Sequence, residues 1–180
     1  MKSLIATGWV FALSLALAGC ATSPVISSGP GHLADEGTVQ VAWRDPAGFR
    51  ETTYGQDRID TLQGVWVRQL AQYLRSQAER QLPAGERLQV TFIDIDRAGE
   101  YEPWLGPRYD DVRMMRDIYP PRIRLEFRRL AANGQLLAEG ERQLVGNDYL
   151  SRSILTRSDD PLRYEKQLLD DWLHQELKTP

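Results

Sequence analysis

The stretch RIRLEFRRLAANGQLLAEGERQLV, residues 122–145, predicts two antiparallel strands joined by a tight turn. Residues 122–131 and 135–145 flank Asn133-Gly134, and Asn-Gly between two such segments is the strongest short-range signal for a β-hairpin. If these two residues alone form the loop, the register of the strands is fixed. The predicted facing pairs are Phe127 with Gly140, Ile123 with Leu144, Arg128 with Glu139, and Glu126 with Glu141. The register places the ring of Phe127 over Gly140 and the opposite charges of Arg128 and Glu139 across from each other, and both pairings favour it.

The hairpin is preceded by DIDRAGEYEPWLGPRYDDVRMMRDIYPPRI, residues 94–123, which concentrates acidic residues, arginines and aromatic rings. Within it, residues Asp110–Ile118 predict a short helix, because their apolar side chains fall on one side and two aspartates occupy the first turn. Trp104 stands in a loop between a proline and a leucine, and we expect it to fold back over the core. The alternative is an exposed ring that stacks on a sugar or contacts a partner.

A strand–helix–strand unit comes before this segment. Alternation predicts strands at residues 39–43 and 88–96, and apolar residues at three- and four-residue steps predict a helix over 58–82 between them. Because a strand–helix–strand unit forms a right-handed crossover, we expect the two strands to be parallel or near neighbours in the sheet. Asp94 and Asp96 share a face with the apolar residues of the second strand, so both carboxylates lie at the edge of the core unless a bulge shifts the phase.

The chain ends in a second long helix, which Asp160 caps and Pro161 begins. We therefore predict an α+β domain with a four-stranded mixed sheet, in the order strand–helix–strand–short helix–strand–strand–helix. Both long helices are expected on one face of the sheet. The opposite face is predicted to form a partner or dimer surface from Ile93, Ile95, Leu130, Leu137 and Val145.

The N-terminus is similar to a bacterial lipoprotein signal. Residues 1–19 contain one lysine and then an apolar run that is short for a membrane span, and the run ends in Leu17-Ala18-Gly19-Cys20. The resemblance implies cleavage before Cys20, lipid attachment to its sulfur, and, with Ala21 next, the periplasmic face of the outer membrane. Residues 20–37 are rich in Ser, Pro and Gly and predict a flexible tether, which leaves 38–180 as a single domain.

Composition and motifs exclude most familiar classes. The formal charge is −3, and no basic patch of the kind that nucleic acid requires is present. The chain has two histidines, His32 and His174, and one cysteine, so the usual zinc ligands and a serine–histidine site have no suitable pattern. No glycine-rich phosphate loop occurs. We predict no metal and no cofactor.

The remaining chemistry belongs to carboxylates and arginines between residues 94 and 123. The candidate residues are Asp94, Asp96, Glu100, Glu102, Trp104, Arg113, Arg116 and Arg122. We expect a structural network in which Asp94 and Asp96 pair with Arg113, Arg116, Arg122 or Arg124, because an unpaired buried carboxylate is costly. The alternatives are a ligand site built on that network, including a calcium site whose spacing fits no EF-hand loop, and the acid and base of a glycosidase.

Four motifs resemble the bacterial envelope family called domain of unknown function 3016. They are WRDPAGF at 43–49, DIDRAGEYEPW at 94–104, DDVRMMRDIYPPRIRLEF at 110–127 and DPLRYEKQLLDDWL at 160–173. The resemblance implies a secreted or lipid-anchored protein and supplies neither an activity nor catalytic residues.

Together these features favour a non-catalytic periplasmic binding or accessory module, attached to the membrane through its N-terminal lipid and contacting an envelope protein. One alternative is a carboxylate-dependent hydrolase of envelope glycans that uses two of Asp94, Asp96, Glu100 and Glu102. The other is a purely structural lipoprotein.

Overall fold

The computed structural model describes residues 29–51, 65–110, 112–153 and 159–178. The predicted signal segment, Cys20, most of the tether and the first turns of the helix predicted over 58–82 lie outside these residues. Among the helices in the described ranges, none has the length and apolar character that a bilayer span requires.

The core of the fold is a mixed sheet with the strand order β1-β2-β3-β6-β7. Its strands are β1 (Gly31–His32), β2 (Val39–Trp43), β3 (Arg87–Asp96), β6 (Arg122–Leu130) and β7 (Leu136–Val145). β2 and β3 are parallel, and every other neighbouring pair is antiparallel. The four predicted strands are present. The sheet has a fifth strand that was not predicted, β1, which comes from the predicted tether. It leads into Leu33, a buried residue whose amide donates to the carbonyl of Val41 at 2.9 Å.

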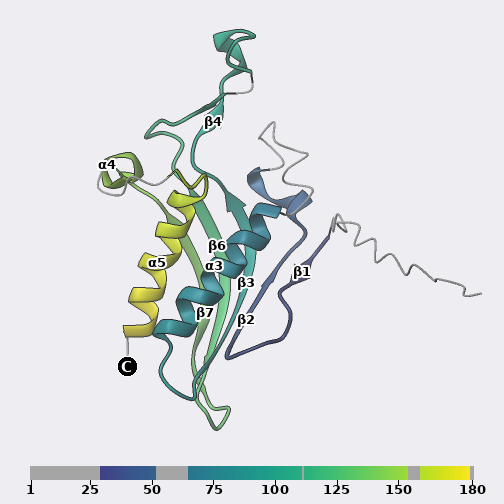
Figure 1. The fold of residues 1–180 in the computed structure, drawn as a ribbon, viewed down its shortest axis with the longest axis vertical. Coiled ribbons are helices and arrows are strands. Elements are labelled where there is room, and N and C mark those ends of the chain that lie inside the picture. Colours follow the sequence, from purple (N-terminus) through teal and green to yellow (C-terminus); the bar gives the residue numbers. More distant parts are fainter. Residues whose placement is uncertain (1–28, 52–64, 111, 154–158, 179–180) are drawn as a thin grey trace, which may run out of the picture.

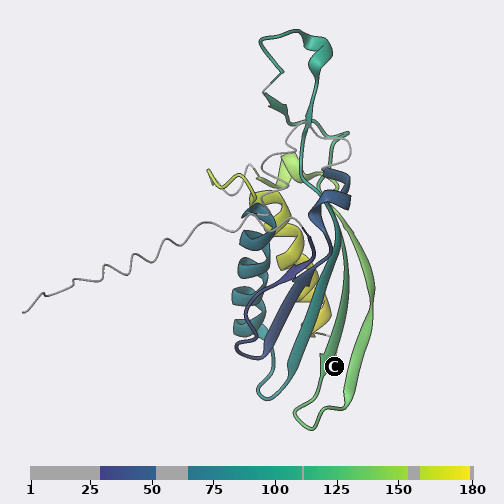
Figure 2. The same cartoon turned by 90° about the vertical axis from the view of Figure 1, so that its right-hand side faces the viewer.

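Two long helices cover one face of this sheet, as Figures 1 and 2 show. They are α3 (Val65–Gln81) and α5 (Arg163–Lys178), and each directs its apolar stripe into the core. The Asp160 carboxylate accepts a hydrogen bond from the Leu162 amide at 2.9 Å ahead of α5. Trp172 of α5 meets Phe127 of the sheet edge-to-face, with 5.7 Å between ring centroids. Both helices therefore pack on one face, as predicted.

The segment between β3 and β6 forms an arm that rises beyond the end of the sheet (Figures 1 and 2). The arm comprises residues 99–110 and 112–119. It contains the strands β4 (Glu100–Tyr101) and β5 (Arg113–Met114), which pair with each other, and a single turn, η2 (Pro103–Leu105). The short helix predicted at 110–118 was wrong, because β5 uses its backbone to pair with β4, and the apolar side chains of Val112 and Met115 are exposed instead of packed. Elsewhere, η1 (Pro46–Gly48) follows β2, and α4 (Tyr149–Ser153) follows β7.

A bulge in β3 corrects the predicted faces of the sheet. The pairing of β3 with β6 shifts register between Phe92 and Asp94, so Ile95 enters the core while Asp94 and Asp96 are half-buried on the other side. The predicted apolar outer face was also wrong, since Ile95 is buried and the middle of that face carries ion pairs. These join Arg44 to Glu126 at 3.0 Å, Arg128 to Glu139 at 3.3 Å and Arg124 to Glu141 at 3.8 Å.

The hairpin register is confirmed at all the predicted pairs. The loop is longer than predicted, because the register shifts beside Leu130 and the amide of Ala131 donates to the carbonyl of Gln135 at 2.8 Å. Residues 132–134 therefore form a three-residue loop, in which Gly134 closes the turn with φ of +86°. This is the common arrangement of a type I turn followed by a left-handed residue.

We expect Gly134→Ala to lower the free energy of unfolding by about 1–2 kcal/mol, because a side chain strains the left-handed conformation. Space is not the cause, since an added Cβ at this position comes no closer than 3.7 Å to another residue. Gly48→Ala is the matched control, because Gly48 lies outside the positive-φ region and a Cβ there meets nothing within 4 Å. Urea denaturation of both variants checks the prediction, and equal changes in stability contradict it.

Candidate functional site

A buried carboxylate at the root of the arm is the centre of the most densely bonded group in the described residues. Glu51 is 2% exposed. Arg113 donates to its two oxygens at 2.7 and 2.9 Å, and Arg97 donates its backbone amide at 2.8 Å and two side-chain groups at 2.9 and 3.1 Å. Burial alone raises the pKa of Glu51, but the bonds and charges of Arg113 and Arg97 outweigh it and hold the pKa below its ordinary value.

Arg113 also binds the backbone where the arm begins. The Arg113 side chain donates to the carbonyls of Ala98, Arg97 and Gly99 at 2.7, 3.0 and 3.1 Å. Gly99 has φ of +83°, and a Cβ there would lie 2.9 Å from the carbonyl oxygen of Met114. The two sides of the arm therefore meet at a position that only glycine fits.

A second carboxyl completes this group from α5. Glu165 is 1% exposed, and one of its oxygens accepts the amide of Ala98 at 2.7 Å, while the other has no hydrogen-bond partner among the described residues. Burial raises its pKa above the ordinary value, and the nearby charges of Arg97 and Arg113 only partly oppose that shift. We call Glu51, Arg97, Arg113 and Glu165 the root clamp.

Farther along the arm, Glu102 is held by its own neighbours. Its carboxylate accepts hydrogen bonds from Arg116 at 2.6 Å and from the hydroxyl of Tyr119 at 2.9 Å. Arg116 is the main cause of a lowered pKa of Glu102. Glu102 is buried within the arm, where it contacts Arg116 and Tyr119, and lies outside the main hydrophobic core of the domain. The hydroxyl of Tyr149 donates to the carbonyl of Arg116 at 2.9 Å and ties the returning side of the arm to α4.

The arm exposes large apolar side chains along its length. Trp104 is 69% exposed, so the expectation that it folds back over the core was wrong: η2 carries it away from the sheet. Six of the large apolar side chains on the surface belong to the arm. They are Trp104, Leu105, Tyr109, Val112, Met115 and Ile118.

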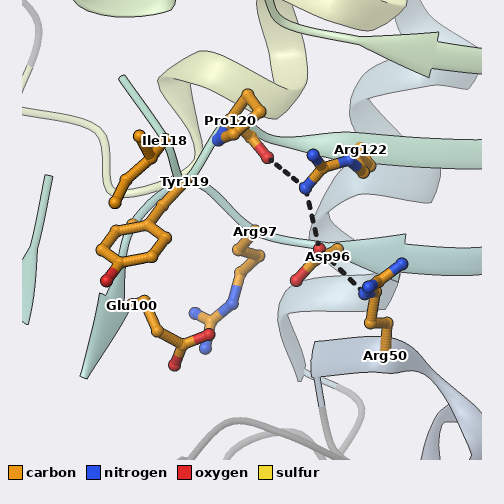
Figure 3. A pocket seen from close by; sticks show the side chains of 9 residues that line it. Arg50, Asp96, Arg97, Glu100, Ile118, Tyr119, Pro120 and Arg122 are labelled. Carbon is orange, nitrogen blue, oxygen red and sulfur yellow. Dashed lines mark hydrogen bonds and ion pairs between the residues drawn. The ribbon is translucent and has the colours of Figure 1, made fainter. Parts of the chain in front are cut away.

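A cavity of about 320 Å³ opens beside the root of the arm. Asp96 faces it between Arg50 and Arg122, whose nearest nitrogens lie 3.6 and 3.5 Å from one Asp96 oxygen, as Figure 3 shows. Burial, and then the charge of Glu51, raise the pKa of Asp96 above its ordinary value, and the two arginines oppose this. Glu100 lies on the opposite wall (Figure 3).

The expected network exists, but with different partners. Asp94 and Asp96 pair with only one of the arginines expected, and Asp94 accepts the backbone amide of Arg50 at 2.7 Å. The observed partners are Arg122 for Asp96, Glu51 for Arg113, Glu102 for Arg116 and Glu141 for Arg124. The four candidate carboxylates therefore do not form one site. Asp96 and Glu100 line the cavity, Asp94 accepts a backbone amide, and Glu102 is bound within the arm.

The sequence interpretation missed Glu51, Arg97 and Glu165. One signal could have identified Glu165: it stands three residues after Leu162 and four before Leu169, on the packing stripe of its helix. A charged residue in that stripe must find a buried partner. Glu51 has no such signal, because it follows a short turn without periodicity.

Among the described residues, no group of histidine, cysteine, aspartate and glutamate is arranged to hold a metal ion.

Comparison with curated proteins and with solved structures found no similar protein. One protein-family profile, described as Protein of unknown function (DUF3016), matches residues 37–175. Since the match spans most of the sequence, from before β2 to the last turns of α5, the chain belongs to the DUF3016 family.

Proposed function

We propose that this protein is a non-catalytic accessory module of the bacterial envelope, anchored through lipid on Cys20 at the periplasmic face of the outer membrane, and that its arm docks on a partner protein. The observation that carries the proposal is the exposure of Trp104 at the end of an arm whose root is held by buried ion pairs. An apolar surface of this kind, raised from the body of a domain, marks an interaction site.

The composition of the arm favours a protein over a lipid surface. Trp104, Arg108 and Tyr109 are of the residue types that dominate binding energy at protein interfaces. Acidic side chains at Glu100, Asp110 and Asp117 lie along the same arm, and anionic headgroups would repel them. A pocket that accepts the indole ring, with a basic rim, is the complementary surface.

The root clamp gives this docking element a fixed position. Arg113 joins Glu51 to three carbonyls at the start of the arm, and Glu165 holds the amide of Ala98 there. An element ordered before binding loses less conformational entropy when the partner docks. The buried charges therefore serve presentation of the arm, and no turnover is required of them.

Photocrosslinking in cells tests the proposal with the full-length, anchored protein. Benzoylphenylalanine in place of Trp104 is expected to give one adduct of defined mass, which Leu105→Asp abolishes and Leu136→Asp leaves intact. The matched control for the crosslinker is benzoylphenylalanine at position 137 in place of Leu137. This residue is 46% exposed on β7, beside the hairpin loop at the opposite end of the molecule (Figure 1). Equal adducts from both positions, or adducts with lipid alone, contradict a protein-docking role.

A second candidate is a carboxylate-dependent hydrolase of envelope glycans. The observation in its favour is that Asp96 and Glu100 line one cavity and that the pKa of Asp96 is raised. The other two carboxylates are unsuitable, because Asp94 accepts the Arg50 amide and Glu102 is bound by Arg116 and Tyr119.

Release of reducing ends from purified envelope glycan decides this candidate. A hydrolase that uses these groups would lose at least about a hundredfold of its rate in both Asp96→Asn and Glu100→Gln. Glu126→Gln is the control, because Glu126 is a surface carboxylate paired with Arg44 outside the cavity. Absence of release by the wild-type protein, or release that both variants retain, eliminates it.

A further inference from the structure

A second cavity, of about 280 Å³, adjoins the first on the outer face of the sheet. The two share Arg50 and Arg122, and the second adds Arg124 and Gln143 from neighbouring strands. Arg122 and Arg124 are two residues apart on β6 and so project from the same face. The ionisable groups in this lining are three guanidinium groups and one carboxylate.

That carboxylate is already engaged. Asp94 accepts the backbone amide of Arg50 at 2.7 Å, which directs one of its oxygens to the loop after η1. The carboxylate partners of Arg122 and Arg124 lie outside the lining of the cavity and at long distances. Arg122 is 3.5 Å from Asp96, and Arg124 is 3.8 Å from Glu141.

These distances differ from those in the root clamp, where Glu51 and its arginines approach to 2.7–2.9 Å. Charge-assisted hydrogen bonds between nitrogen and oxygen lie at about 2.7–2.9 Å. Arg122 and Arg124 therefore hold loose ion pairs at the rim, and an oxyanion in the cavity would offer them shorter ones. Neither pair excludes solvent, since both arginines are more than a third exposed.

We propose that this cavity binds a phosphate group, either free or as the phosphoester of a larger envelope molecule. Its donors come from three elements, with Arg50 after η1, Arg122 and Arg124 on β6, and Gln143 on β7. A tetrahedral phosphate accepts hydrogen bonds from several directions at once, whereas a planar carboxylate is satisfied by one bidentate arginine. The proposal does not depend on the docking role of the arm.

Titration of the full-length protein with soluble anions, followed by NMR or calorimetry, tests it. Inorganic phosphate is expected to bind, and Arg122→Gln and Arg124→Gln are each expected to weaken binding by about tenfold, the value of one charge-assisted hydrogen bond. Arg128→Gln is the matched control, because Arg128 lies on the same strand and face, pairs with Glu139 at 3.3 Å and does not line the cavity.

Glycerophosphoglycerol, a headgroup without acyl chains, distinguishes the source of the phosphate: binding as tight as that of inorganic phosphate supports a lipid headgroup, and weaker binding supports free phosphate or a monoester. Acetate that binds as well as phosphate overturns the proposal, as does an equal loss in Arg128→Gln or no response to phosphate at 10 mM, roughly the weakest affinity of interest. Trp104→Ala is expected to bind phosphate normally, so this test and the crosslinking test fail independently.

Discussion

Glu51→Gln is expected to lower the free energy of unfolding by about 3–5 kcal/mol, the usual cost of removing one partner from a buried ion pair. The substitution conserves shape but removes the negative charge that Arg97 and Arg113 share. Both guanidinium groups then remain largely buried after losing the carboxylate that they share. Guanidinium denaturation measured by circular dichroism gives the change in stability.

Glu126→Gln provides the comparison for this loss. Glu126 makes a single contact of 3.0 Å with Arg44, and both side chains are at least half exposed, so solvent screens the pair. An exposed pair of this kind contributes about 0–1 kcal/mol. If both substitutions destabilise the protein equally, burial of the root clamp has no energetic consequence and its proposed role in holding the arm is wrong.

The parts of the fold that follow from the sequence are those with a sustained period. In the first strand of the hairpin, apolar and charged residues alternate from Arg122 to Arg128, so the turn at Asn133-Gly134 could place Phe127 opposite Gly140. The bulge in β3 could not be predicted, because Phe92 and Ile93 are consecutive apolar residues and either phase buries one of them. Two-residue β1 has too few positions to show alternation.

The arm and its clamp show a different limit. Local spacing at 110–118 matched a helix, but the outcome depends on whether a surface exists to cover its apolar side. Arg113 finds its carboxylate 62 residues away, and Arg97 finds the same carboxylate 46 residues away. Charge pairing over such separations leaves no pattern in one sequence, so the residue types were identified and most of the partners were not.

Glu165→Gln is expected to change the dependence of stability on pH. Burial raises the pKa of Glu165 in the folded protein, so between its ordinary pKa of 4.5 and the raised value the folded state holds a proton that the unfolded state has lost. Stability contributed by this group therefore falls as pH rises through that window, by up to about 1.4 kcal/mol per pH unit. Below the ordinary value both states are protonated and the contribution is constant.

Glutamine keeps the oxygen that accepts the Ala98 amide and cannot ionise, so the variant should gain stability relative to the wild type as pH rises from 4 to 7. Glu51 acts in the opposite sense: its pKa is lowered, so its contribution is present above the ordinary value and lost on acidification. Because Glu51 is common to both proteins, it cancels in their difference. Melting temperatures across pH 4–7, with Glu139→Gln as a surface control, measure that difference, and a constant offset between the variant and the wild type means that Glu165 does not titrate on folding.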